Sequence, residues 1–189
     1  MIDPAKIAFD VDGVVADTMS LFLALLQDQY NITGIRLEDI TDYHLSSCLD
    51  IDHDILESAI NALVEGRYEQ PLHPIPHAPQ VLKRLAGVCK PVRFITARPV
   101  IGPMQQWFKD TIGLGPDTAN LTAVGAFEAK TDVLLSNGIS WFVEDRLETC
   151  HLLHEAGILP ILFRQPWNRK PHPFQEVDGW AELENLIDF

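Results

Sequence analysis

Short apolar segments alternate with segments of helical spacing along most of this chain, and the alternation limits the folds it can adopt. The expected strands cover residues 6–11, 91–96, 119–124, 139–144 and 159–163. The helical segments between them lie near residues 79–86, 101–111, 129–136 and 148–156, and just beyond three of these stand Gly87, Gly138 and Gly157, where a helix ends. This order predicts an α/β fold, a parallel sheet with helices on both faces. Ligands in such sheets bind at the carboxyl ends of the strands.

Residues 18–70 interrupt the alternation, because they show helical patterning and no convincing strand. We expect two helices here, over residues 19–30 and 54–65. Their N-terminal caps are expected at Asp17 or Thr18 and at Asp52.

A helical segment directly after the first strand predicts a small lid over the site at the strand ends. We therefore expect a core domain of residues 1–17 and 71–189 and a helical cap of residues 18–70. The expected hinges are residues 13–17 and the proline-rich segment 70–76.

The composition limits the cellular location and the binding partners that we expect for this chain. The formal charge is −13, which disfavours binding to a nucleic-acid polymer because phosphate contacts need clustered Lys and Arg. No apolar run approaches the roughly 18 residues of a membrane span, so we expect no membrane partner. There is no signal-peptide pattern, and the three cysteines lack metal-finger spacing, so we expect reduced thiols and a cytoplasmic protein. The sequence does not indicate an oligomeric state.

Asp10 and Asp12 follow the first apolar segment directly, and Gly13 comes next. Alternate side chains of a strand point to the same side, so the two carboxylates are expected side by side at the strand end. Their mutual repulsion must be offset, either by a bound divalent cation or by a division of roles in which one is the nucleophile and the other the proton donor. The alternative is an ordinary turn, which Asp and Gly also favour.

Two later segments offer groups that bind phosphate. Thr96 and Ala97 end the second expected strand, where a hydroxyl and backbone N–H groups can donate to phosphate oxygens. Thr96 could instead only cap a helix opened by Pro99. Lys130 lies at the start of an expected helix, where a cation interacts unfavourably with the helix dipole. This unfavourable position indicates a functional role for Lys130, and the alternative is a solvated surface lysine.

Glu144 and Asp145 end the fourth expected strand. Acidic side chains gathered beside Asp10 suit a hard cation, and Mg²⁺ takes oxygen ligands and keeps several waters. The alternative is that Asp145 caps the next helix.

These four segments, in this order, resemble the four motifs of the haloacid dehalogenase-like (HAD) superfamily. The resemblance extends from Lys6 to about Phe163 and implies a Rossmann-like core with a phosphatase site. It implies Asp10 as nucleophile and Asp12 as acid/base. Its phosphate ligands would be Thr96, Ala97 and Lys130, and its Mg²⁺ ligands Asp10, Asp12 and Asp145, with Glu144 a weaker candidate and Arg98 nearby.

Within the superfamily, Asp12 argues against a dehalogenase, and the lack of lysine between Asp12 and Pro79 argues against a phosphonatase. The segments 72–78 and 163–168 resemble the 5′(3′)-deoxyribonucleotidase family, although His77 stands where that family has Gly. The resemblance implies a small phosphorylated substrate, such as a nucleoside or deoxynucleoside monophosphate.

The cap departs most from that family, which offers paired Phe residues where this chain has Arg67 and Tyr68. Tyr68, Tyr43 and Phe22 are the candidates for stacking on a base, and Arg67 could instead meet a second anionic group. The alternatives are a sugar-phosphate phosphatase, a phosphomutase, or a non-catalytic binding protein on the same fold.

Overall fold

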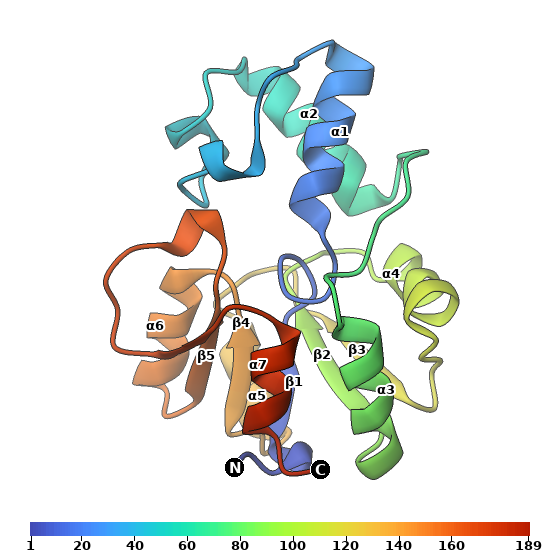
Figure 1. Ribbon diagram of the computed structural model, residues 1–189, viewed down its shortest axis with the longest axis vertical. Coiled ribbons are helices and arrows are strands. Elements are labelled where there is room, and N and C mark those ends of the chain that lie inside the picture. Colours follow the sequence, from blue (N-terminus) through green and yellow to red (C-terminus); the bar gives the residue numbers. More distant parts are fainter.

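The computed structural model describes residues 1–189, and its centre is one parallel sheet of six strands (Figure 1). The strands are β1 (Ile7–Phe9), β2 (Val92–Thr96), β3 (Ala119–Ala123), β4 (Trp141–Glu144), β5 (Leu159–Phe163) and β6 (Gln175–Val177). Their order is β3-β2-β1-β4-β5-β6, and every neighbouring pair is parallel. The predicted α/β fold is therefore confirmed, with β6 as an additional edge strand.

Helices cover both faces of the sheet because the central strands are apolar on both sides. Phe9 of β1 stacks on Trp180 with ring centroids 5.3 Å apart, whereas its neighbour Ala8 belongs to the core on the opposite face, with Leu134 and Phe142. The helices are α1 (Thr18–Tyr30), α2 (His53–Glu65), α3 (Ala78–Val88), α4 (Gly102–Trp107), α5 (Lys130–Ser136), α6 (Leu147–Glu155) and α7 (Trp180–Leu186).

Five shorter helical turns complete the chain: η1 (Pro4–Lys6), η2 (Leu37–Asp39), η3 (Leu45–Ser47), η4 (Phe108–Ile112) and η5 (Pro166–Asn168). The first three and the last are 3₁₀ turns, and η4 continues α4 as a π-helical turn. No helix is long and apolar enough to cross a membrane.

One helix boundary differs from the sequence prediction. Gly138 and Gly157 lie just beyond α5 and α6 with positive φ, as expected, but Gly87 lies inside α3, which continues to Val88. The helix after β2 begins at Gly102, close to the predicted start at residue 101 and not at Pro99 as the capping alternative required. Thr96 is therefore separated from that helix by a loop and does not cap it.

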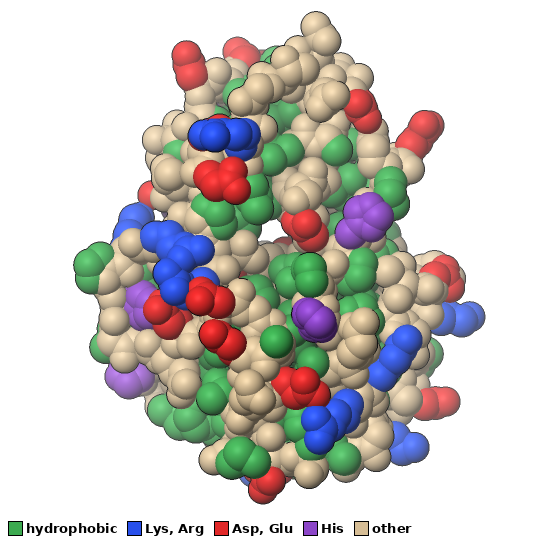
Figure 2. Space-filling view, in the orientation of Figure 1, with side chains coloured by type: hydrophobic (Ala, Val, Ile, Leu, Met, Phe, Trp, Pro, Cys, Tyr) green, Lys and Arg blue, Asp and Glu red, His purple; other side chains and the backbone are tan.

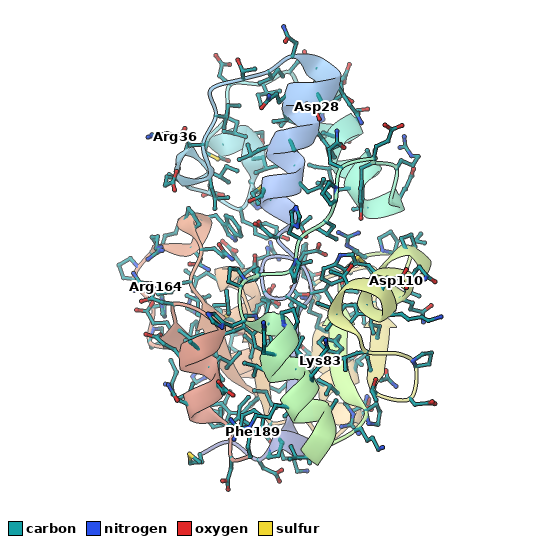
Figure 3. The ribbon with its side chains drawn as sticks, turned by 45° about the vertical axis from the view of Figure 1, so that its right-hand side comes forward. Asp28, Arg36, Lys83, Asp110, Arg164 and Phe189 are labelled. Carbon is teal, nitrogen blue, oxygen red and sulfur yellow. The ribbon has the colours of Figure 1, made fainter.

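Residues 18–70, which we call the cap, contain α1, η2, η3 and α2 and no strand. Asp17 and Asp52 cap the two long helices, because their side chains accept hydrogen bonds from the amides of Ser20 and Asp54. Figures 1 and 3 show the cap above the carboxyl ends of the strands, with the labelled Asp28 and Arg36 in it and Lys83 and Phe189 in the core below. The division into two domains stays a prediction.

The two segments that join the cap to the core run side by side. The amide of Asp17 donates to the carbonyl of His73 over 2.9 Å, and the amide of Ile75 donates to the carbonyl of Val15 over 2.8 Å. These bonds keep both connections beside the end of β1.

Candidate active site

The candidate site lies at the carboxyl end of β1, where the strand order reverses. From β1 the chain proceeds to β2 and β3 on one side of the sheet and then returns to β4 on the other. The helical connections consequently leave a crevice outside the end of β1, the usual ligand position in such sheets. Asp10 is the first residue after β1, and its amide still donates to the carbonyl of Val143 in β4 over 2.9 Å.

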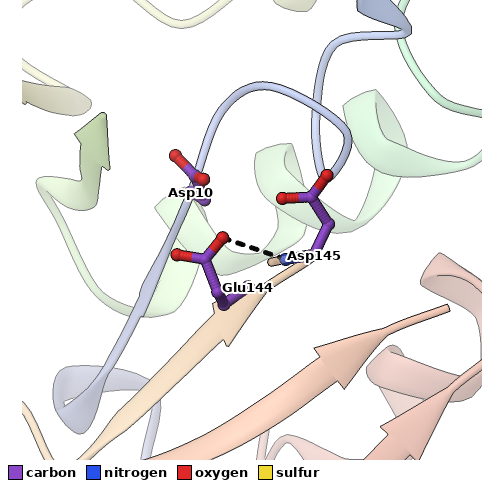
Figure 4. A group of neighbouring side chains, drawn as sticks. All are labelled: Asp10, Glu144 and Asp145. Carbon is purple, nitrogen blue, oxygen red and sulfur yellow. Dashed lines mark hydrogen bonds between the residues drawn. The ribbon is translucent and has the colours of Figure 1, made fainter. Parts of the chain in front are cut away.

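Three buried carboxylates meet in this crevice. Asp10, Glu144 and Asp145 each offer an oxygen within 4.8 Å of the others, at the ends of β1 and β4 (Figure 4). One ammonium group faces them, since Nζ of Lys130 lies 2.7 Å from Oδ2 of Asp10 and 2.8 Å from Oε2 of Glu144. Lys130 is fully buried, so its charge is committed to this cluster.

The cluster has more negative than positive charge. Burial and the charge of Glu144 raise the pKa of Asp10 well above its ordinary range, although Lys130 pulls it down. Burial, followed by the charges of Glu144 and Asp10, also raises the pKa of Asp145. A cation would remove this repulsion, and the all-oxygen donor set suits a hard divalent ion such as Mg²⁺.

Glu144 differs from the other two carboxylates because protein groups already bind it. Besides Lys130, the amides of Asp145 and Arg146 donate to its Oε1 over 3.1 Å each. Burial opposes its ionisation, but the charge and hydrogen bond of Lys130 outweigh this and lower the pKa of Glu144. Glu144 therefore anchors Lys130, and Asp10 and Asp145 are the better candidates for metal ligands.

Asp145 is held from three sides and does not cap α6, which has Arg146 at its N-cap position. Trp167 donates from Nε1 to its Oδ2 over 3.0 Å, and Asn168 donates from Nδ2 to its carbonyl over 2.7 Å. Gly13 closes the third side, since a Cβ there would lie 2.1 Å from Oδ2 of Asp145. This tight fit keeps the carboxylate in the crevice.

Asp12 does not join the carboxylate cluster, although the sequence analysis predicted it as a metal ligand. Its two oxygens accept hydrogen bonds from Nε and Nη2 of Arg98 over 2.8 and 2.7 Å. The hydroxyl of Thr18 donates to Oδ1. Burial opposes ionisation here too, but Arg98 outweighs it and lowers the pKa of Asp12. The carboxylate of Asp12 thus faces Arg98 rather than a cation bound at Asp10.

Thr96 and Ala97 lie on the other side of Asp10, directly at the end of β2. The Thr96 side chain is 1% exposed, and its hydroxyl accepts a hydrogen bond from the amide of Arg98 over 3.2 Å. The hydroxyl proton is left free to donate toward the crevice. Both residues line the same cavity as Asp10.

A cavity of about 480 Å³ connects these groups with the cap. Figure 2 shows a hollow on one face at this level, between the cap and the core. The cap contributes apolar and aromatic residues to its wall, together with the polar His44, Ser46, His53 and Glu57. The apolar and aromatic lining includes Met19, Phe22, Tyr43, Leu56, Ile60 and Leu63 from the cap and Phe127 and Trp167 from the core. A cavity of this size suits a small organic phosphate.

The cap residues proposed to contact the substrate separate into two groups. Tyr43 and Phe22 line the cavity, but Tyr68 and Arg67 do not. Arg67 is exposed and pairs with Glu65. Tyr68 is half-buried outside the wall, so Tyr43 is the better candidate for contact with a substrate.

Several site residues were not predicted from the sequence as parts of the site. Thr18 was predicted only as a possible helix cap, and Trp167 only as part of a turn that resembles a family pattern. Phe127, whose ring meets that of Tyr43 edge-on at 5.6 Å, lies in a loop without periodic pattern. No local signal would have identified it.

Two relatives match nearly the whole chain. "Putative nucleotidase YqfW" of Bacillus subtilis (strain 168) is 29% identical over 182 residues, covering 94% of this chain and 90% of that protein. "Putative nucleotidase BH1399" of Halalkalibacterium halodurans is 27% identical over 188 residues, covering 97% and 92%.

Solved structures share the fold. A predicted phosphoglycolate phosphatase from Haemophilus somnus has a TM-score of 0.63 at 14% identity, covering 96% of this chain and 97% of its own. CbbY from Rhodobacter sphaeroides, solved in complex with phosphate, has a TM-score of 0.59 at 15% identity, covering 94% and 95%.

The family model described as "5' nucleotidase, deoxy (Pyrimidine), cytosolic type C protein" matches residues 4–189, nearly the whole chain. The non-catalytic alternative is therefore set aside in favour of a hydrolase. The chain belongs to this 5′ nucleotidase family and is a phosphatase with the HAD fold.

Proposed function

We propose that this protein is a Mg²⁺-dependent phosphomonoester hydrolase that acts through an aspartyl-phosphate on Asp10. The observation that carries the proposal is the position of Asp10 at the floor of the cavity, with Lys130 at 2.7 Å and Thr96 beside it. A nucleophile, a fixed cation and a hydroxyl donor around one position are the parts that phosphoryl transfer needs.

The reaction has two balanced steps. A carboxylate oxygen of Asp10 attacks phosphorus while the bond from phosphorus to the ester oxygen breaks, and the alcohol leaves with a proton that Asp12 passes on. Because Arg98 favours the ionised form of Asp12, this proton enters with the phosphate group of the substrate, bound as its monoanion. Water then attacks the same phosphorus and gives a proton to Asp12. Inorganic phosphate is released with this proton and Asp10 is regenerated.

The carboxylates of Asp10 and Asp145 are the side chains that would hold Mg²⁺, with Trp167 orienting Asp145. When bound, the cation offsets the charge of the phosphoryl oxygens. Lys130 keeps Asp10 in place, and Thr96 and the amides near Ala97 donate to the phosphoryl oxygens.

We propose a nucleoside or deoxynucleoside monophosphate as the substrate. Support comes from the family description, from the relatives' names and from the aromatic wall that Tyr43, Phe22 and Phe127 provide above the phosphate position. A sugar phosphate would leave that wall without a partner. Our proposed location is the cytoplasm, supported by three cysteines that form no disulfide.

The test is a panel of phosphomonoesters assayed with Mg²⁺ and with excess EDTA. It includes deoxynucleoside and nucleoside monophosphates and sugar phosphates. We expect phosphate release that needs Mg²⁺ and that Asp10→Asn abolishes, while the exposed Asp117→Asn serves as matched control and retains activity. Full activity in EDTA, or wild-type turnover by Asp10→Asn, would refute the mechanism, and preference for sugar phosphates would refute the substrate.

A further inference from the structure

The guanidinium of Arg98 connects parts of the molecule that are far apart in the sequence. Its Nε and Nη2 bind both oxygens of Asp12, and its Nη1 donates to the carbonyl of Leu63 in the cap over 3.0 Å. Arg98 is only 5% exposed, so this arrangement is not a loose surface contact. The planar fork of an arginine can make these bonds together, whereas a lysine ammonium lacks that geometry.

The contact with the cap is made at a defined point. Leu63 lies in the last turn of α2, which ends at Glu65 with Gly66 in the left-handed conformation behind it. Carbonyls of a last turn have few partners within their helix, and a cation is favourable there. The bond from Arg98 therefore depends on the end of α2 being docked at the core.

The first cap helix, α1, also reaches Asp12. Thr18 is the first residue of α1, and its hydroxyl donates to the Oδ1 of Asp12 that also accepts from Arg98. The orientation of this carboxylate is consequently determined by both cap helices, by α1 directly and by α2 through Arg98.

We infer that Arg98 is a positioning residue that couples docking of the cap to the action of Asp12. The inference rests on the proposed acid/base role of Asp12. When α2 is docked, Arg98 holds the carboxylate of Asp12 in one orientation beside the cavity. When α2 moves away, Arg98 loses one of its fixed points and Asp12 loses its alignment.

The test compares two substrates, deoxyuridine 5′-monophosphate, whose leaving group is an alcohol, and p-nitrophenyl phosphate, whose leaving group needs no proton. Asp12→Asn should lower kcat/KM for the nucleotide by roughly 10²–10⁴-fold and for the aryl phosphate much less. Arg98→Ala should reproduce this substrate dependence, and it should add little to Asp12→Asn in the double variant. Arg98→Lys should recover part of the loss.

The matched control is Arg146→Ala. Arg146 is a half-buried arginine that, like Arg98, links core and cap, since its guanidinium lies 5.0 Å from the ring centroid of Tyr43, but it has no bond to Asp12. This variant should lower kcat/KM for both substrates by similar factors. Hydrogen exchange at the end of α2 should quicken in Arg98→Ala and stay at the wild-type rate in Arg146→Ala.

The outcomes separate the two proposals. Equal losses on both substrates in Arg98→Ala, additive with Asp12→Asn, would overturn the role of Arg98 and leave the proposed function intact. Equal losses in Asp12→Asn itself would overturn the acid/base role of Asp12 and this inference with it. No turnover of either substrate by the wild type would overturn the proposed function as well. If Arg98→Ala does not fold, Arg98→Lys carries the same comparison.

Discussion

The indole of Trp167 donates a hydrogen bond from Nε1 to Oδ2 of Asp145, and this bond joins the turn after β5 to the end of β4. A donor to one oxygen of a carboxylate leaves the other oxygen directed at the crevice. Groups of this kind orient the residues that bind a metal directly.

Replacing Trp167 by Phe should keep most of the packing and remove the donor. We expect the Kd for Mg²⁺, measured by calorimetry without substrate, to rise by roughly 10–100-fold. Trp107→Phe is the control, because it removes an indole donor to the carbonyl of Leu72, away from Asp145. Equal Kd values in the two variants would show that Trp167 only packs.

Gly13→Ala should eliminate both Mg²⁺ binding and turnover. A Cβ at this position would lie 2.1 Å from Oδ2 and 2.7 Å from Cγ of Asp145, and φ is +71°. The control is Gly157→Ala, where φ is +85° but no atom lies within 4 Å of the added Cβ. The control variant has the backbone strain of a positive φ without the steric clash, so it should still bind Mg²⁺. Binding that persists in Gly13→Ala would contradict the close approach described here.

The sheet could be predicted because its strands are short apolar runs with Gly or Pro at their borders. Edge strand β6 could not, since two of its three residues, Gln175 and Glu176, are exposed and give no apolar pattern. The acidic strand ends could be predicted for the same reason as the strands, because Asp10 and the pair Glu144-Asp145 directly follow uninterrupted apolar segments.

The pairing of Asp12 with Arg98 could not be predicted, because 86 residues separate them and only tertiary packing brings them together. Local patterning suggested Asp12 as a third carboxylate beside Asp10, and the structure groups Glu144 there instead. Tyr43 lies between η2 and η3, in a segment without periodicity, so its position at the cavity depends on how the cap packs.

Lys130→Met should destabilise the metal-free protein by roughly 3–5 kcal/mol, because it leaves buried carboxylates without their cation. The loss of stability in Lys130→Met should depend on pH. Lys130 lowers the pKa of Glu144, so it contributes stability above the pKa of the unfolded chain, and this contribution is lost as the pH falls. The difference between wild type and variant should therefore stay constant above about pH 5 and shrink as the pH falls below about 5 through the lowered pKa of Glu144.

Urea unfolding in EDTA measures this difference. Lys6→Met is the control, since the ammonium of Lys6 is exposed and binds only the carbonyl of Gly138. Lys6→Met should lower the free energy of unfolding by less than about 1 kcal/mol at every pH. A deficit in Lys130→Met that also stays constant as the pH falls through the lowered pKa of Glu144 would mean that its carboxylate partners do not determine its effect.

The last prediction concerns substrate recognition by Tyr43, which lines the cavity, in comparison with Tyr68, which does not. Stacking of a base on an aromatic ring contributes roughly 1–3 kcal/mol. Tyr43→Ala should therefore raise KM for deoxyuridine 5′-monophosphate by roughly 5- to 150-fold. Tyr43→Phe keeps the ring and should stay near wild type, and Tyr68→Ala should have little effect. Deoxyribose 5-phosphate lacks the base, so its KM should barely change in any of these variants. A similar rise in KM for both substrates in Tyr43→Ala would mean that Tyr43 supports the cap through Phe127 and Arg146 rather than contacting a base.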